Sequence, residues 1–206
     1  MSSVRSRPTK AAVVTEFRRT QILRAARESF ARYGLGPVTM SQIAKRARVA
    51  KGTIYLHYHS KEAILRDAVR DGIKDLRLAT VPVISEAGSL ESTVRRFFEA
   101  TLTFFDGTRD FFYLCHAELE PRLRDEIRQE IRVVYAAQIE AWHTRLKALD
   151  GKHKADAKRM PAAEAARMIV SFAFGLSGQR VRGWTDHAAA DDAAAATALV
   201  LKGIGL

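Results

Sequence analysis

The side chains best suited to bind a polyanion gather between residues 39 and 61. Within this stretch Lys51, Gly52 and Thr53 offer in turn a positive charge, a backbone without a Cβ atom and a hydroxyl group. Tyr55, one helical turn after Lys51, adds a second hydroxyl group. The major groove of B-DNA admits one helix, whose first residues then meet base edges and phosphates. The residue types therefore predict contact with double-stranded DNA.

Two short helices are expected to position these side chains. The first covers residues 39–47, with Thr39 as its N-cap and Gln42 placed to complete a capping box. The second begins near Ala50, with Val49 and Ile54 pointing inward. Two short helices joined by a tight turn are typical of a helix-turn-helix.

Longer helices flank this motif on both sides. A helix from Thr15 carries the apolar stripe Ile22, Ala26, Phe30 and Tyr33 at helical spacing, and Gly34 ends it. Another helix starts at its N-cap Ser60, covers residues 60–78 and links the motif to the rest of the chain. Residues 15–60 are thus expected to form the DNA-binding domain. Residues 1–14 are expected to form a flexible basic arm, either a disordered tail or a segment that follows a DNA groove.

The net charge of +11 is unevenly distributed over the 206 residues. Residues 1–80 hold 17 Lys and Arg against 6 Asp and Glu, so they carry the whole excess, and the remainder is neutral. A basic surface can also serve solubility alone, but charge concentrated in one part of a chain favours nucleic-acid binding there.

The remaining chain, residues 79–206, shows helical periodicity without strand alternation. Expected helices cover residues 90–105, 109–118, 121–149, 161–184 and 191–202. The fold class is therefore all-α: an N-terminal three-helix helix-turn-helix DNA-binding domain followed by a larger helical domain.

Other chemistry has little support in the residue types. His57 and His59 diverge at a helix end without ligand partners at metal spacing, so no metal is expected. Cys115 beside His116 sits among aromatic residues, as buried cysteines do. We therefore expect no enzyme, no cofactor and no membrane span, and a single cysteine fits the reducing cytoplasm.

From Ile22 to Leu65 the chain resembles the TetR/AcrR family of bacterial transcriptional regulators. The resemblance rests on Ile-Leu-x-Ala-Ala from Ile22, Thr-x-x-x-Ile-Ala from Thr39, Gly-Thr-x-Tyr from Gly52, and the ending Lys61-Glu62 before Leu65, in that order. It implies a homodimer that binds a palindromic operator, with contacts to phosphate, sugar and bases. The positions implied are Thr39, Ser41, Lys51, Gly52, Thr53, Tyr55, Leu56, His57 and Lys61. Arg48 is added to these candidates for its charge, although it departs from the family pattern.

Two residues depart from the family pattern, which usually has Gly and then Ser where this chain has Arg48 and Ala50. Arg48 must adopt a left-handed conformation or shift the turn. Ala50 offers no side-chain cap to the second short helix. Arg48 adds a charge that is hypothesised to reach phosphate.

The resemblance also implies that residues 79–206 bind a small, largely apolar effector and form the dimer. An aromatic core without a pocket would explain the same residues. The expected ligand residues are Phe98, Leu102, Phe105, Phe112, Cys115, His116, Tyr135, Gln138, Trp142, Met168 and Phe172. The expected dimer residues are Met168, Phe172, Gly175, Leu176, Gln179, Val181 and Leu199.

A ligand-released repressor is the function that this reading favours. A transcriptional activator would have the same DNA chemistry, and a nucleoid-type protein would bind without sequence preference. A helical enzyme would need clustered catalytic groups, which the sequence does not offer.

Overall fold

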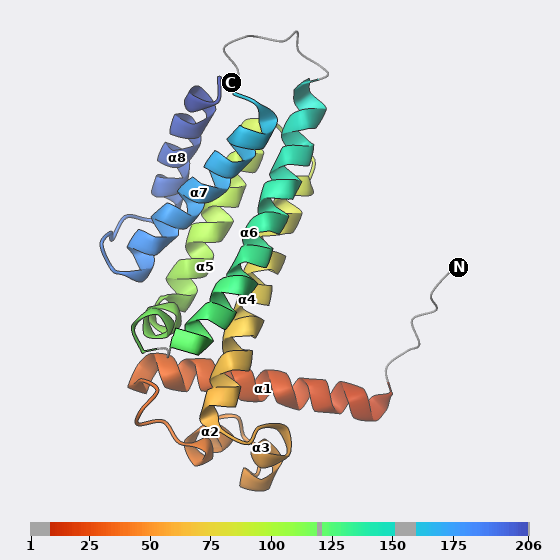
Figure 1. The fold of residues 1–206 in the computed structure, drawn as a ribbon, viewed down its shortest axis with the longest axis vertical. Coiled ribbons are helices and arrows are strands. Elements are labelled where there is room, and N and C mark those ends of the chain that lie inside the picture. Colours follow the sequence, from red (N-terminus) through yellow and green to blue (C-terminus); the bar gives the residue numbers. More distant parts are fainter. Residues whose placement is uncertain (1–8, 119–120, 151–159, 206) are drawn as a thin grey trace. The chain divides into compact units, whose positions relative to one another are not determined.

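The computed structural model describes residues 9–118, 121–150 and 160–205, and these residues form eight α-helices (Figure 1). The chain divides into two compact units, Met1–Asp71 and Gly72–Leu206. The all-α fold class is confirmed for the described residues. Helix α4 (Lys61–Ser85) contributes residues to both units.

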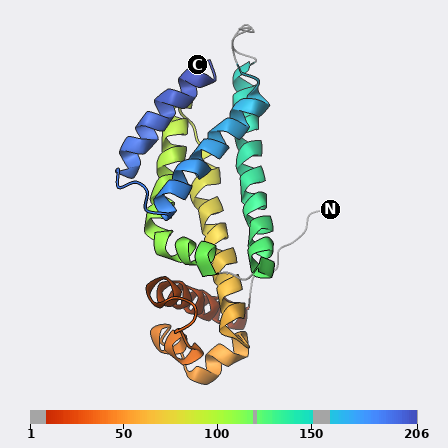
Figure 2. The same cartoon turned by 60° about the vertical axis from the view of Figure 1, so that its left-hand side comes forward.

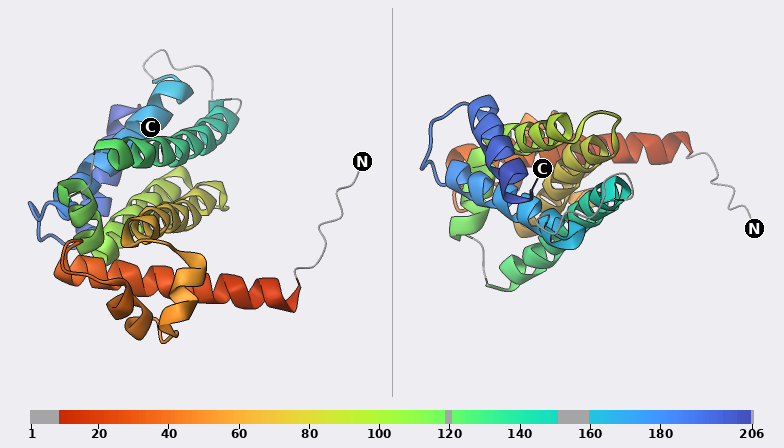
Figure 3. Two further views of the ribbon diagram at one scale, coloured as in Figure 1. Left: turned by 60° about the horizontal axis from the view of Figure 1, so that its bottom comes forward. Right: turned by 90° about the horizontal axis from the view of Figure 1, so that it is seen from above.

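The first unit contains α1 (Lys10–Tyr33), α2 (Met40–Arg46), α3 (Lys51–His57) and the first turns of α4. Helices α2 and α3 lie on the same side of α1 (Figures 1 and 3). Ile22, Phe30, Ile43, Ile54 and Ile64 are fully buried and form the centre of this small core. The apolar periodicity therefore places α1 as predicted, except that Tyr33 at the end of the stripe is half exposed.

Helix α1 begins five residues earlier than expected. Thr9 caps it, with its hydroxyl oxygen accepting a hydrogen bond from the amide of Ala12. Residues 10–14, assigned to a flexible arm, are therefore helical, and residues 1–8 lie outside the described residues. The error has a physical cause: this first part of α1 is exposed, so no apolar stripe marked it as helix.

The second unit contains the rest of α4, then α5 (Leu90–Glu118), α6 (Pro121–Asp150), α7 (Ala162–Val181) and α8 (Ala189–Gly203). Helix α7 packs against α5 and α6, and α8 packs against α5 (Figure 2). Aromatic side chains fill the interior, where Phe97 meets Trp142 edge to face with ring centroids 5.4 Å apart.

Two expected helix boundaries are wrong in this unit. Residues 90–105 and 109–118 form the single helix α5, because Phe105 and Phe112, two turns apart, pack their rings at 5.3 Å across Gly107. Helix α4 continues past residue 78 and through Pro82 to Ser85. Pro82 removes one backbone hydrogen bond, but it and Leu78 are exposed, so water can reach the freed carbonyl.

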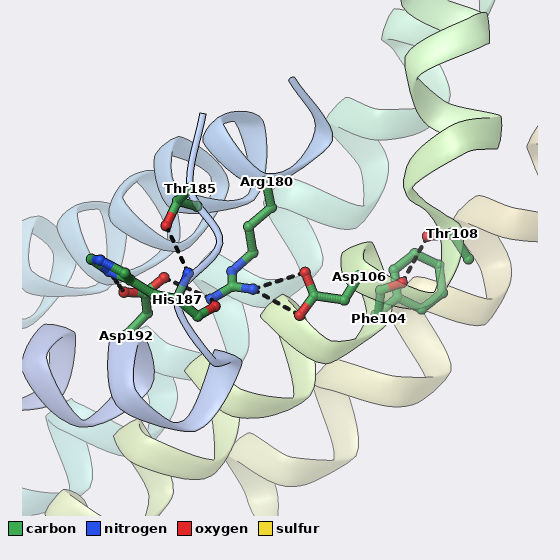
Figure 4. Close-up of polar contacts among 7 residues, drawn as sticks. All are labelled: Phe104, Asp106, Thr108, Arg180, Thr185, His187 and Asp192. Atoms are coloured by element: carbon green, nitrogen blue, oxygen red, sulfur yellow. Dashed lines mark hydrogen bonds and ion pairs between the residues drawn. The ribbon is translucent and has the colours of Figure 1, made fainter. Parts of the chain in front are cut away.

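A buried arginine ties three elements of the second unit together (Figure 4). Arg180 on α7 donates two hydrogen bonds to Asp106 on α5, at 2.7 and 2.8 Å, and one to Asp192 on α8, at 2.6 Å. A fourth hydrogen bond reaches the carbonyl of His187 in the α7–α8 loop. Burial by itself would lower the pKa of Arg180, but the two carboxylates outweigh it and raise that pKa. The guanidinium is thus a permanent charge that fixes α8 against α5.

Candidate DNA-binding surface and effector region

Helix α2 begins with the predicted capping box. The Thr39 hydroxyl accepts from the amide of Gln42, and the amide of Thr39 donates to Oε1 of Gln42 at 2.8 Å. Ile43 and Ala44 are buried while Thr39 and Ser41 are exposed. The cap therefore fixes the start of α2 and leaves both hydroxyl-bearing residues facing solvent.

The turn between α2 and α3 takes the left-handed form at Arg48, whose φ is 55°. Arg48 is the only non-glycine residue with a positive φ among the residues that the structure describes. Its amide donates to the carbonyl of Lys45, and the amide of Val49 donates to that of Ala44. Arg48 thus closes the tight turn as a glycine would, at a cost in backbone strain. As expected, Ala50 gives α3 no side-chain cap.

Helix α3 presents most of the predicted DNA contacts to solvent. Lys51, Gly52, Tyr55 and Leu56 are exposed, and Leu56, at 84%, is the most exposed large apolar side chain among the described residues. Thr53 and His57 are half-buried. A Cβ atom on Gly52 would meet nothing within 4 Å inside the protein, so the protein itself does not require glycine there.

Lys61 has a role inside the first unit that the sequence did not reveal. Its ammonium group donates hydrogen bonds to the carbonyl oxygens of Leu35 and Gly36, both at 2.8 Å. These carbonyls follow α1, so Lys61 holds the α1–α2 connection against the start of α4. Two of its three protons are therefore already used within the protein.

A second set of contacts, also missed from sequence, fastens α3 and α4 to α1. Arg19 lies 2.8 Å from Asp67, and the buried Tyr58 donates its hydroxyl to the same carboxylate oxygen at 3.3 Å. Arg27 pairs with Asp71 at 3.1 Å. Burial raises the pKa of Tyr58 to about 12. The partners in these ion pairs are 44 and 48 positions apart, so no sequence pattern indicates that they meet.

A hollow of about 510 Å³ lies beside the helix-turn-helix. Its lining combines Tyr33, Ser29 and Val38 with the cations Lys45, Arg46 and Arg48 and with Gln42. The guanidinium of Arg46 lies 5.9 Å from the centre of the Tyr33 ring. The basic run from Lys45 to Arg48 was the available sequence signal for this surface, and only Arg48 was singled out.

Most of the predicted ligand residues lie in the core of the second unit, and Met168 does not. Phe98, Leu102, Phe105, Cys115, Gln138 and Trp142 are buried, and Phe112, Tyr135 and Phe172 are half-buried. Phe172 meets Phe98 edge to face at 5.9 Å, and Tyr135 hydrogen-bonds to Ser171 at 2.6 Å. The side chain of His116 lies outside the described residues. Met168 is exposed, so the structure does not bring it to this core.

The predicted dimer residues lie mostly on the outer face of α7 and α8. Met168 and Leu199 are 56% and 61% exposed, Gly175 and Gln179 are exposed, and Phe172 and Leu176 are half-buried. Val181 is buried within the chain instead. Helical periodicity explains the exception, because Val181 falls on the side of α7 that also holds Ala173 and Ser177, both buried.

Metal-ligating side chains are not clustered in the part of the chain that the structure describes. No cluster of three His, Cys, Asp or Glu side chains there could hold a metal ion. Cys115 is buried, and burial raises the pKa of its thiol to about 12, so it is held as the unreactive thiol. None of the described helices is long and apolar enough to cross a membrane.

Comparison with known proteins identifies the first unit. Residues 22–68 match the family model for bacterial regulatory proteins of the tetR family. Residues 22–68 therefore form a domain of the tetR family. Its similarity to the A-factor receptor protein of Streptomyces griseus is 38% identity over 73 residues, which cover 35% of this chain and 25% of that one. A regulator of Bacillus subtilis, YhgD, is 31% identical over 87 residues, which cover 42% of this chain and 46% of YhgD.

Solved structures extend the likeness of fold to the second unit. FadR from Bacillus subtilis, solved in complex with stearoyl-CoA, superposes with a TM-score of 0.64 at 20% sequence identity. The aligned region covers 90% of this chain and 98% of the FadR chain. At this identity the likeness shows the TetR-type fold alone. The sequence matches cover between 20% and 46% of the first relatives' own lengths. The family model matches residues within the first unit.

Proposed function

We propose that this protein is a ligand-responsive transcriptional regulator that binds a palindromic operator as a homodimer and represses transcription. The observation that carries the proposal is the exposed row Lys51, Gly52, Tyr55 and Leu56 on α3, within the residues that match the tetR family model. An exposed leucine beside a lysine and a tyrosine suits a groove that offers thymine methyl groups and phosphates. Most of these contacts position the protein, and few read bases.

Cations around the hollow add to the electrostatic attraction. Lys45, Arg46 and Arg48 extend the positive charge from α3 to the end of α2. If the Arg48 side chain meets phosphate, Arg48→Gly reduces the slope of log affinity against log salt by about one contact. An unchanged slope would show that Arg48 serves the turn only.

The outer face of α7 and α8 supports the homodimer. Met168 and Leu199 are large exposed apolar side chains, and the exposed Gly175 allows close approach of a second helix. Two such helices from each subunit would form a four-helix interface around a two-fold axis. That symmetry places two recognition helices about one DNA turn apart or further, which is why a palindrome is expected. Met168→Glu together with Leu199→Glu should give monomers in analytical ultracentrifugation. The paired control Arg95→Glu and Lys147→Glu, at exposed positions of α5 and α6, should not.

Release by an effector follows from the continuity of α4. This helix holds residues of both units, so a ligand that favours one arrangement of the second unit changes the population of DNA-binding states. A coupling free energy of about 1–3 kcal/mol is typical of such responses. We expect this effector to be small and largely apolar, because aromatic side chains form the interior of the second unit.

Selection of binding sites from random DNA tests the function directly. A regulator enriches a palindrome and prefers it over scrambled DNA by roughly a thousandfold or more. A nucleoid-type protein enriches no site and binds both sequences alike. Transcription assays with the selected site then separate repression from activation, since the two share the same DNA chemistry.

A further inference from the structure

Four buried side-chain atoms among the described residues of the second unit lack hydrogen-bond partners, and two of them belong to arginines, Arg145 and Arg180, whose terminal nitrogens are paired. The other two belong to uncharged side chains. Gln138 and Trp142 lie one turn apart on α6, and both side chains are fully buried. Oε1 of Gln138, an acceptor, and Nε1 of Trp142, a donor, have no partner in the described structure. Native cores rarely leave such atoms unpaired, so each one calls for an explanation.

Thr80 fixes the orientation of the Gln138 amide. The Thr80 hydroxyl donates its proton to the carbonyl of Leu76 at 2.8 Å, so its oxygen is left to accept. It accepts from Nε2 of Gln138 at 2.7 Å. Turning the amide over would set two acceptors against each other, so Oε1 is the atom that remains open.

We propose that Gln138 and Trp142 together bind one hydroxyl group of the effector, and that the effector is an uncharged, largely apolar alcohol or phenol. Side chains four residues apart on a helix are neighbours, so one hydroxyl group between them can donate to Oε1 of Gln138 and accept from Nε1 of Trp142. An ether or ketone oxygen satisfies Trp142 alone. This assignment rests on the proposed ligand response and names the chemistry of the ligand.

The apolar side chains around Trp142 disfavour a charged ligand group at this position. Arg145, three residues after Trp142 on α6, already donates from its terminal nitrogens to the carbonyls of Glu86 and Gly88 and to Thr93. The buried cluster that contains Trp142 consists of apolar residues, among them Phe97, Phe98, Leu102 and Ile169. A carboxylate bound there would lose its hydration without gaining a cation from that cluster. A hydroxyl group meets the need of both atoms without bringing a charge into the core.

Trp142 itself supplies the first test. The chain has two tryptophans, and Trp184 is 73% exposed, so Trp184→Phe leaves the buried Trp142 as the single indole fluorophore. The full-length variant is titrated with 1-decanol, 1-methoxydecane and decanoate, and with the matched adamantane set of 2-adamantanol, its methyl ether and its carboxylate. In at least one set the alcohol should change Trp142 emission and bind about tenfold or more tightly than the ether and the carboxylate.

Variants then locate the preference. Gln138→Leu and Trp142→Phe remove one hydrogen-bonding group each, and thermal shift replaces fluorescence as the measurement. Both should remain folded and bind the alcohol and its ether alike. Gln129→Leu, on the exposed side of the same helix, is the matched control and should keep the preference.

Two outcomes overturn the proposal. One is that no alcohol of either set binds, which leaves a buried water as the partner of the two atoms. The other is that the preference survives in both Gln138→Leu and Trp142→Phe. Binding-site selection is independent of these assays, so a selected palindrome without alcohol preference rejects this inference and keeps the proposed DNA-binding function. An alcohol preference without a selected site does the reverse.

Discussion

The guanidinium of Arg19 lies 2.8 Å from the carboxylate of Asp67, joining α1 to the start of α4 within the DNA-binding unit. Tyr58, directly after α3, donates its hydroxyl to the same oxygen. The carboxylate raises the pKa of Arg19, as expected for an ion pair. One acidic side chain thus connects α1, the end of α3 and α4.

Asp67→Asn should loosen this connection. The change removes the ion pair and weakens the hydrogen bond from Tyr58, and we expect a loss of about 1–2 kcal/mol because the group is partly buried. Native-state hydrogen exchange at the buried face of α1 measures it. Asp125→Asn breaks the exposed pair with Arg128 and should cost less than about 0.5 kcal/mol. Equal effects of the two changes would contradict the connecting role of Asp67.

Arg48→Gly should stabilise the motif. The residue has a φ of 55°, which costs an L residue about 1 kcal/mol and costs glycine nothing, although glycine loses more chain entropy on folding. A net gain of up to about 1 kcal/mol is expected in urea unfolding. Lys45→Gly removes the same charge from inside α2 and should destabilise the protein by about 1 kcal/mol. Destabilisation by Arg48→Gly would mean that the arginine side chain, and not its backbone, matters for stability.

Alkaline pH should weaken the DNA-binding unit through Tyr58. Its pKa is about 12 in the folded protein against an ordinary value of 10, so the folded state holds the proton more tightly. The stabilisation is complete below pH 10 and is lost as pH rises from about 10 to 12, by at most about 1.4 kcal/mol per pH unit. Comparing Tyr58→Phe with the parent chain isolates this group from the lysines. The parent should lose stability more steeply over this range, and parallel curves would refute the assignment.

Arg180→Met should destabilise the second unit by about 3 kcal/mol. The change leaves Asp106 and Asp192 without their shared cation, and the cost of removing one partner of a buried ion pair exceeds the net value of the pair. Thermal unfolding measures the loss. Arg182→Met, two residues later and exposed, serves as the control and should have a small effect. A small effect at both positions would show that Arg180 does not hold α8 in place.

Cys115 should resist alkylation in the folded protein. Burial raises the pKa of its thiol to about 12, so the reactive thiolate is scarce at pH 8. Iodoacetamide should modify the native chain at least a hundredfold more slowly than the urea-unfolded chain, as followed by intact mass. Equal rates would mean that the end of α5 opens readily or that the thiol is accessible.

The sequence by itself determined the helices and the motif. Capping of α2 by Thr39 and Gln42, burial of Ile43 and Ile54, and the left-handed demand at Arg48 depend on residues within a few positions of one another. Local interactions of this kind can be read along a chain because their partners are fixed by helical geometry. Residues 10–14 are helical without an apolar stripe because they are exposed. Helix α5 continues through Gly107, where aromatic packing outweighs the helix-weakening glycine.

Only the tertiary structure decided which distant groups meet. Arg19 with Asp67, Lys61 with the carbonyl of Gly36, and Arg180 with Asp106 are pairs separated by 25 to 74 positions. Many basic and acidic side chains could pair equally well from the sequence, since charge attraction has no periodicity along the chain. The same holds for Oε1 of Gln138 and Nε1 of Trp142, which have no hydrogen-bond partner. A missing partner can be recognised only when the whole surrounding core is in place.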